Sequence, residues 1–540
     1  MTMSHTTRKR RTPPTMLRPA APHRRLLSDV AAHVGGRLQG RDTEVNGVTL
    51  SSTDLRPGEL FVGVRGANRH GAEFAAQAAA AGAAAVLTDR DGAEIAAATG
   101  LPIVVVDDPR GVLGDVAMFV HGTAPGQDLP LLLGTTGTNG KTSVTHLLEG
   151  ILTQIGVTAG ASTSAERVVA GERVVSGLTS PEATEFHALL ALMRERGVEA
   201  FAVEVSAQAI TRRRLEGVIF DVAAFTNLTH DHLDDYGDME TYYAAKAPFF
   251  TKARARRAVV SLDSPAGARI AADADIPVTT IAARGIAAPE AVERADWVVA
   301  VTSEAQTATG FTLTHRDGRR LATTVPVIGA HMAANAGLAI VMMLEAGYAW
   351  ERITAALERD GGIRAWVPGR TQLVSGPEGP AVYVDFGHTP DAFEKTLAAV
   401  RHVTPGRVLM LFGADGDRDS LKRPDMARAA VAGSDITVIT DHHPRFENAA
   451  DIRRVLVESA RAADPDHEIH EVSPPEAAIV KAVSLVGPGD AILWAGPGHQ
   501  NYRDIEGVQY AYSARELARQ ALIDAGWPAG ERVWPNPYED

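Results

Sequence analysis

The stretch Gly134-Thr-Thr-Gly-Thr-Asn-Gly-Lys-Thr142 decides the fold of this chain. It follows the apolar strand Leu131-Leu-Leu133 and opens a helix, which is the setting of a phosphate-binding P-loop. Glycines let backbone N–H groups approach phosphate oxygens, while the Lys141 ammonium can reach the β- and γ-phosphates and the Thr142 hydroxyl can bind Mg²⁺. The strict Walker spacing wants a glycine at position 135, where this chain has threonine. An ordinary glycine turn is the alternative, but the strand–loop–helix context favours phosphate binding.

Strands and helices alternate on the C-terminal side of the loop. Between residues 129 and 367 the pattern predicts strands at 201–205 and 222–225, and helices at 333–345 and 351–358. Such alternation predicts a mostly parallel sheet covered on both faces.

A second α/β pattern begins near Pro368 and continues to the end of the chain. Predicted strands at 381–385, 408–412, 436–439 and 491–494 alternate with helices, as in an open Rossmann-like sheet. Ligands of such sheets bind beyond the carboxyl ends of the strands, where Asp385, Gly413, Asp441 and Gly496 lie. Residues 26–128 show shorter strands and helices and end in a glycine- and proline-containing linker. We therefore predict an α/β protein of three domains: 26–128, 129–367 and 368–540.

Composition narrows the function classes. The chain has 540 residues, a formal net charge of −13 and no cysteine. The charge argues against a nucleic-acid binder, and the missing cysteines exclude disulfides, thiolate zinc sites and a cysteine nucleophile. Residues 1–25 carry a basic run at Arg8-Lys-Arg-Arg11, and we predict a disordered leader there. No apolar stretch has signal-peptide or transmembrane character, so we expect no membrane insertion. Separately from this absence, we expect the protein to be a monomer and to be located in the cytoplasm.

The GTxGTNGKT form of the loop resembles that of Mur ligases and folylpolyglutamate synthetases. From about residue 26 onward, further segments resemble, in order, Mur ligases of the type that adds the third amino acid to the UDP-linked cell-wall precursor (MurE type). The resemblance implies that residues 26–128 bind the uridine-linked precursor. It implies that 129–367 bind ATP and that 368–540 bind the incoming amino acid.

Two segments resemble the magnesium-binding segments of the family. Phe201-Ala-Val-Glu-Val-Ser206 implies Glu204, and Phe225-Thr-Asn-Leu-Thr-His-Asp-His-Leu-Asp234 implies His232, as metal ligands beside Thr142. Tyr242-Tyr-Ala-Ala-Lys-Ala-Pro-Phe-Phe250 resembles the segment that carries a carbamylated lysine. CO₂ on a neutral Lys246 amine gives a carboxylate-like oxygen ligand, which would support a second Mg²⁺. The implied catalytic residues are Lys141, Lys246, Glu204 and His232.

The resemblance also implies an ATP site and a precursor site. Gly329-Ala-His-Met-Ala-Ala-Asn335 resembles the family's HNxxN segment near the adenine, with Met332 where asparagine is usual. The implied ATP-binding residues are Gly137, Thr138, Asn139, Gly140, Lys141, Thr142, Ser143, Asn335, Arg370 and Asp385. Thr49-Leu-Ser-Ser-Thr-Asp54 and Leu178-Thr-Ser-Pro-Glu182 resemble segments that contact the precursor. The implied precursor contacts are Ser52, Thr179, Ser180, Ser206 and Arg214, with turn or cap roles as the alternative.

The segments that select the amino acid depart most from the family. Gly413-Ala-Asp-Gly-Asp-Arg-Asp419 carries Asp415 where glycine is usual. Asp441-His-His-Pro-Arg445 stands where diaminopimelate-adding members have DDNPR, and Gly496-Pro-Gly-His-Gln500 stands where they have GKGHE. Loss of an acid at position 500 removes a partner for a distal ammonium, so the candidates are lysine, ornithine, another diamino acid or homoserine. The implied amino-acid contacts are Arg418, His442, His443, Arg445, Gly496 and Gln500.

The implied function is an ATP-dependent amide ligase that acts on UDP-MurNAc-L-Ala-D-Glu through an acyl phosphate, with ATP, two Mg²⁺ ions and a lysine carbamate. A related ligase with another UDP-linked or natural-product acceptor is the nearest alternative. A non-catalytic binding protein on the same fold is a further one, against which the intact Lys141, Glu204, His232 and Lys246 argue. A P-loop ATPase coupled to motion would show a Walker B strand, which we do not find.

Overall fold

The P-loop strand β8 (Leu131–Thr136) lies in the middle of an 11-stranded sheet in the computed structural model, which describes residues 16–66 and 68–530. The seven strands from β9 to β16 in that sheet run parallel, as predicted. Antiparallel strands extend both edges. In spatial order the strands are β11 (Glu172–Val175), β10 (Glu166–Val169), β9 (Ala159–Ser162), β12 (Ala200–Glu204), β8, β13 (Phe220–Phe225), β14 (Ala255–Ser261), β15 (Val278–Ala283), β16 (Trp297–Ala305), β17 (Ala308–His315) and β18 (Arg320–Val325).

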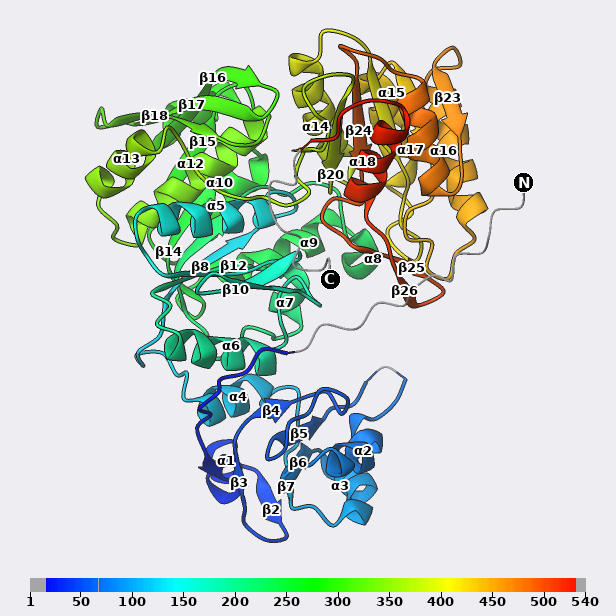
Figure 1. Ribbon diagram of the computed structural model, residues 1–540. Coiled ribbons are helices and arrows are strands. Elements are labelled where there is room, and N and C mark those ends of the chain that lie inside the picture. The colour runs from blue at the N-terminus through cyan, green and yellow to red at the C-terminus, as the bar shows by residue number, and fades with distance from the viewer. Residues whose placement is uncertain (1–15, 67, 531–540) are drawn as a thin grey trace.

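Helices cover both faces of this central sheet (Figure 1). One apolar core lies on the side of α5, α12 and α13, and a second lies on the side of α6. Because a core lies on each face, nearly all residues of the central strands β8, β9, β12 and β13 are buried. The helices of this region are α5 (Lys141–Gln154), α6 (Ala183–Glu195), α7 (Ala207–Thr211), α8 (Leu233–Tyr236), α9 (Met239–Lys246), α10 (Pro265–Asp273), α11 (Pro289–Arg294), α12 (Ala330–Glu345) and α13 (Trp350–Arg359).

The N-terminal region forms a separate small sheet at the far end of the molecule (Figure 1). Strands β4 to β7 are parallel to their neighbours, and β2 pairs antiparallel with β7. Its strands are β2 (Arg37–Gln39), β7 (Ile103–Val105), β6 (Ala85–Thr88), β5 (Leu60–Gly63) and β4 (Val48–Thr49). Its helices are α1 (Leu27–His33), α2 (Ala75–Ala80), α3 (Arg90–Ala96) and α4 (Leu113–His121).

The C-terminal region has a six-stranded, mostly parallel sheet with an apolar core on each face, which confirms the predicted Rossmann-like pattern. Only the short edge strand β19 runs antiparallel. The strand order is β19 (Gln372–Leu373), β20 (Ala381–Asp385), β24 (Ala491–Ala495), β21 (Val408–Phe412), β22 (Ile436–Ile439) and β23 (Glu468–Glu471). The helices are α14 (Pro390–Val403), α15 (Arg423–Gly433), α16 (Ala449–Ala463), α17 (Pro475–Ser484) and α18 (Ala514–Asp524), and a hairpin joins β25 (Tyr502–Ile505) to β26 (Val508–Ala511).

Residues 16–25 are not disordered, which corrects our prediction for this part of the leader; residues 1–15 lie outside the described residues. The Arg18 guanidinium is 4% exposed and donates to the Glu59 carboxylate, which is also 4% exposed, at 2.5 Å. Two backbone amides, of Ala20 and Ala21, donate to Glu195 at 3.2 and 3.1 Å. The buried ion pair with Glu59 holds Arg18 in one conformation, and the composition of the leader does not reveal that such a partner exists.

Replacing Arg18 by alanine is expected to destabilise the N-terminal domain by about 3 kcal/mol, because it leaves the Glu59 carboxylate buried without its partner. Thermal unfolding followed by circular dichroism measures the effect. The matched control is Arg24→Ala, since Arg24 pairs with Glu44 while the two side chains are 71% and 56% exposed. That pair should contribute less than about 1 kcal/mol. Equal unfolding midpoints for the two variants would contradict a structural role for Arg18.

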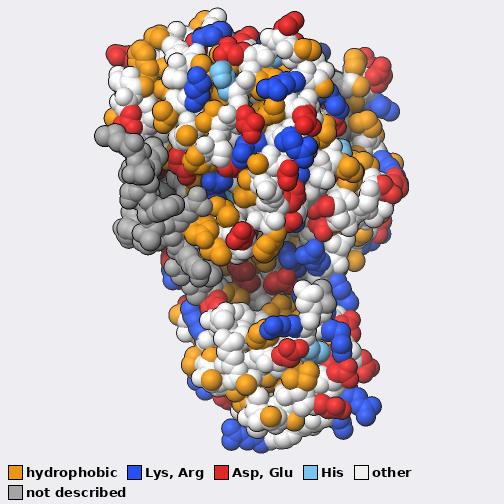
Figure 2. Space-filling view, turned by 90° about the vertical axis from the view of Figure 1, so that its right-hand side faces the viewer, with side chains coloured by type: hydrophobic (Ala, Val, Ile, Leu, Met, Phe, Trp, Pro, Cys, Tyr) orange, Lys and Arg blue, Asp and Glu red, His pale blue; other side chains and the backbone are white. Residues whose placement is uncertain are grey.

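None of the helices in residues 16–66 and 68–530 combines the length and the apolar character that crossing a bilayer requires. Acidic and basic side chains are interspersed over the face shown in Figure 2, where the N-terminal domain is set off from the rest by a waist.

Candidate active site

A cavity of about 500 Å³ lies between the central and C-terminal domains. It opens at the carboxyl ends of the parallel strands of both sheets, the position where ligands of such sheets bind. The P-loop, the segment after β12 and the loop after β13 form its central-domain wall, and the loops after β20, β21, β22 and β24 form the opposite wall. Segments that are hundreds of residues apart in the chain therefore face one common space.

The P-loop adopts the shape that its glycines permit. Gly137 and Gly140 have φ values of 147° and 89°, and a side chain at Gly137 would collide with Thr226. The Thr226 hydroxyl donates to the Asn139 carbonyl at 2.6 Å, which holds the loop against the end of β13. The Lys141 ammonium donates to the carbonyls of Gly137 and Thr138 at 3.1 and 2.7 Å. The loop is therefore curled around its lysine at the N-terminus of α5, as a phosphate-binding loop requires.

The two predicted oxygen ligands lie side by side. Glu204 ends β12 and is 3% exposed, and its Oε2 accepts hydrogen bonds from the Thr142 hydroxyl at 2.8 Å and from the Ser164 amide at 2.9 Å. Both Glu204 and Thr142 line the cavity. A carboxylate and a hydroxyl at this spacing are hard oxygen donors of the kind that Mg²⁺ prefers, so these residues fit the metal.

His232 lies on the same wall in a left-handed backbone conformation, with φ of 57°. Its Nδ1 is 3.2 Å from the Gln208 amide nitrogen, and its Nε2 is 3.5 Å from Asp231 Oδ2. Burial lowers the pKa of His232 to about 4, although Asp231 opposes the shift. The imidazole is therefore neutral at physiological pH, which is the form that binds metals.

Lys246 lies behind the P-loop and does not line the cavity. It ends α9, is 1% exposed, and donates to the Gly137 carbonyl at 2.9 Å, with its ammonium 4.6 Å from the centre of the Tyr242 ring. Burial lowers the pKa of Lys246 well below its usual value, and the positive charge of Lys141 lowers it further. The structure therefore favours a neutral amine at this position, which is the form that reacts with CO₂.

Most of the residues predicted for ATP are brought together. Asn335 lines the cavity on α12, and its amide nitrogen lies 3.8 Å from the sulfur of Met332. Arg370 stacks on Phe386, with its guanidinium carbon 4.5 Å from the ring centre. Asp385 accepts from the Thr371 amide at 2.7 Å, which fixes the start of the C-terminal domain. The predicted ATP residues that line the cavity are Thr138, Asn139, Gly140, Lys141, Thr142, Ser143, Asn335, Arg370 and Asp385.

The predicted precursor residues fall into three groups. Thr179, Ser206 and Arg214 line the cavity. Ser180 does not: it is fully buried, and its hydroxyl donates to the Glu204 carbonyl at 2.8 Å, so it supports the end of the strand that carries Glu204. Ser52 lies in the N-terminal domain, outside the cavity, where its hydroxyl donates to Gln77 at 3.0 Å.

Sequence reasoning missed two polar contacts that join the two domains beside His232. Asp231 is 5% exposed and lies 2.8 Å from the Lys422 ammonium, and His230 pairs with Asp419 at 3.1 Å. Burial would raise the pKa of Asp231, but Lys422 and the neighbouring histidines lower it below its usual range. A signal was present, because Asp231 sits between two histidines in a segment already assigned to metal binding.

The residues predicted for the amino acid gather at the C-terminal wall. Arg418, His442, Arg445, Gly496 and Gln500 line the cavity. His443 lies behind them: it is 2% exposed, and its Nε2 hydrogen-bonds Gln500 Oε1 at 2.9 Å. Asp415, which was noted only as a departure from the family, lines the cavity beside them.

Comparisons with known families cover most of the chain. The Mur ligase middle domain matches residues 135–343, and the Mur ligase glutamate ligase domain matches residues 369–498. The Mur ligase family catalytic domain matches residues 44–121.

Full-length relatives and a solved structure agree with these matches. UDP-N-acetylmuramyl-tripeptide synthetase of Leifsonia xyli is 53% identical, over 95% of this chain and 99% of its own. UDP-N-acetylmuramoyl-L-alanyl-D-glutamate–2,6-diaminopimelate ligase of Streptomyces avermitilis is 40% identical, over 94% and 98%. A solved UDP-N-acetylmuramoyl-L-alanyl-D-glutamate–2,6-diaminopimelate ligase superposes with a TM-score of 0.59 at 25% identity and covers 89% of this chain and 95% of its own.

Proposed function

The chain belongs to the Mur ligase family, and we propose that it is the ATP-dependent ligase that adds the third amino acid to UDP-MurNAc-L-Ala-D-Glu in peptidoglycan precursor synthesis. The observation that carries this proposal is the shared cavity. It places the Lys141 P-loop and the Glu204–Thr142 pair opposite the Arg418 wall of the C-terminal domain. A nucleotide phosphate and an amino acid can therefore meet there.

The proposed reaction has two steps. The free carboxylate of the dipeptide attacks the γ-phosphorus of ATP, the bond to the β–γ bridging oxygen breaks, and an acyl phosphate and ADP form. The amine of the amino acid then attacks the acyl carbon. The bond between the acyl carbon and the phosphate oxygen breaks, and inorganic phosphate leaves with that oxygen. The former ammonium loses two protons as it becomes the amide N–H. The protein mainly positions the reactants and stabilises the charge that develops on the phosphoryl oxygens.

The residues of the central wall supply this stabilisation. Lys141 and the P-loop amides hold the β- and γ-phosphates, and Arg370 adds a second cation on the C-terminal side of the cavity. Glu204, Thr142 and His232 would hold Mg²⁺, and a carbamate on Lys246 would support a second ion. When bound, Mg²⁺ would neutralise phosphate charge and orient the γ-phosphoryl group. We place the reaction in the cytoplasm, carried out by a monomer.

The experiment that tests this function is phosphate release from ATP by purified protein with Mg²⁺, UDP-MurNAc-L-Ala-D-Glu and one amino acid at a time. We expect release only when both the dipeptide and an accepted amino acid are present, with a nucleotide tripeptide detected by mass spectrometry. The control omits the dipeptide. Binding of ATP without release, for every amino acid tried, would point to another acceptor or to a non-catalytic role.

A further inference from the structure

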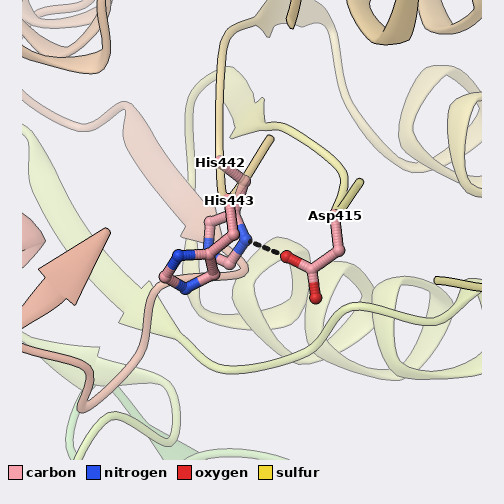
Figure 3. A group of neighbouring side chains, drawn as sticks. All are labelled: Asp415, His442 and His443. Atoms are coloured by element: carbon pink, nitrogen blue, oxygen red, sulfur yellow. Dashed lines mark hydrogen bonds and ion pairs between the residues drawn. The ribbon is translucent and has the colours of Figure 1, made fainter. Parts of the chain in front are cut away.

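Three side chains from two loops of the C-terminal domain meet at the amino-acid end of the cavity (Figure 3). Asp415 follows β21, and His442 and His443 follow β22. His442 Nδ1 is 2.7 Å from Asp415 Oδ1, and the two imidazole rings lie edge to face with centres 4.2 Å apart. Possible ligand atoms of the three residues lie within 4.8 Å of one another, a spacing that a metal ion could use.

Hydrogen bonding speaks against a metal at this cluster. His443 Nδ1 accepts from the Asp504 backbone amide at 2.9 Å, so its Nε2 carries the hydrogen and donates to Gln500 Oε1 at 2.9 Å. Both ring nitrogens of His443 are therefore engaged, and neither offers a free lone pair to an ion. His443 instead lies behind the cavity lining and holds Gln500 in place through this hydrogen bond.

Asp415 and His442 both line the cavity, and their contact leaves one acceptor of the pair without a partner. In the tautomer that donates Nδ1–H to Asp415, His442 Nε2 carries a lone pair, and this buried nitrogen has no hydrogen-bond partner among residues 16–66 and 68–530. Burial would raise the pKa of Asp415, but the two imidazoles and Arg445 lower it well below its usual range. Next to this carboxylate and a ring nitrogen without a hydrogen-bond partner, a ligand group that donates hydrogen bonds is favoured. A cationic donor is favoured most, because its hydrogen bonds to a carboxylate are charge-assisted.

The two arginines nearby are not equivalent. Arg445 donates to the Gly416 carbonyl at 3.1 Å and lies 3.8 Å from Asp415 Oδ2, so its guanidinium is already paired within the protein. Arg418 is exposed on the cavity wall, and no hydrogen bond or ion pair engages it within the described part of the chain. This end of the cavity thus has one guanidinium, that of Arg418, that is available to bind a single carboxylate of a substrate.

We propose that the Asp415–His442 pair selects the incoming amino acid by binding a distal ammonium, so that the substrate is an L-diamino acid with a single carboxylate. Arg418 binds that carboxylate. A second, distal carboxylate, as in diaminopimelate, would be repelled by the Asp415 carboxylate and would find Arg445 already paired with Asp415. A neutral hydroxyl, as in homoserine, makes only an uncharged hydrogen bond to Asp415, which is weaker than the contact of an ammonium. This inference rests on the proposed ligase function.

The test is a steady-state comparison of the wild type and Asp415→Asn on L-lysine, L-ornithine, L-2,4-diaminobutyrate, L-homoserine and meso-diaminopimelate. The wild type is expected to prefer one of the three monocarboxylic diamino acids. Asp415→Asn should raise the KM for that amino acid on the order of tenfold or more, since a charge-assisted contact is lost. kcat should change less, and the preference over L-homoserine should shrink by a similar factor.

The matched control is Asp417→Asn, on the same loop but outside the cavity lining. Asparagine tolerates the left-handed conformation of that position, where φ is 49°, so its KM values should match the wild type. A wild-type preference for meso-diaminopimelate or homoserine overturns the inference without any variant. So does an unchanged diamino-acid KM in Asp415→Asn. Absence of tripeptide with every amino acid would instead reject the ligase function itself.

Discussion

Replacing Lys141 by alanine is expected to lower kcat on the order of a thousandfold, the largest single effect we predict in this protein. The P-loop is curled so that this ammonium lies against the Gly137 and Thr138 carbonyls, at the edge of the cavity where phosphate oxygens would replace them. Because charge on the γ-phosphoryl group grows during transfer, loss of the Lys141 ammonium should affect kcat more than the KM for ATP. Initial rates of ADP release measure both parameters.

The matched control for Lys141 is Lys252→Ala, which removes an exposed lysine outside the cavity lining. That variant should retain wild-type rates, and both variants should unfold at the same temperature as the wild type. If Lys141→Ala kept more than about a tenth of the activity, the phosphate-binding role of the loop would be wrong.

Loss of the Lys246 side chain is expected to have the second largest effect, with Lys246→Ala lowering kcat on the order of a hundredfold. Lys246 does not touch the cavity, but its buried amine lies 2.9 Å from the Gly137 carbonyl and would carry the carbamate toward the metal site. With ¹³C-bicarbonate, the wild type should show a carbamate carbon signal by NMR, and Lys246→Ala should not.

Lys246→Arg separates the carbamate from a simple positive charge. A guanidinium keeps the cation but has no neutral amine to react with CO₂, so this variant should also be nearly inactive. Full activity of Lys246→Arg would contradict the carbamate, and so would a wild-type rate that stays unchanged when CO₂ and bicarbonate are removed. Either result would show that Lys246 acts as a cation or only fills space in the core.

Local patterns predicted much of the fold. Buried apolar runs predicted three of the parallel strands of the central sheet, β8, β12 and β13, and four of the C-terminal sheet, β20, β21, β22 and β24. The glycine spacing predicted the P-loop at the start of α5. The antiparallel strands at both edges of the central sheet were missed. At one edge, β10 and β11 have the same sequence, Glu-Arg-Val-Val, and are joined by Ala170 and Gly171, both with positive φ. Such a two-residue turn is a hairpin signal, but arginine and glutamate in short strands weaken the apolar pattern.

Contacts between distant segments explain what the sequence could not reveal about the site. Asp231 and Lys422 are 191 residues apart and pair only because the domains meet. Ser180 matched a precursor-binding segment, yet its hydroxyl is turned inward to Glu204, and side-chain direction is not encoded in a motif. Asp415 drew notice only as a replaced glycine until the structure placed it against His442.

The measurement that tests the account most directly is an isotope transfer from the dipeptide. UDP-MurNAc-L-Ala-D-Glu is labelled with ¹⁸O in the carboxylate that becomes the amide, incubated with ATP, Mg²⁺ and the accepted amino acid, and the phosphate is analysed by mass spectrometry. Since the acyl phosphate breaks at its carbon–oxygen bond, one ¹⁸O should appear in each phosphate released as tripeptide forms. Tripeptide formation with unlabelled phosphate, or ¹⁸O recovered in AMP, would contradict the account.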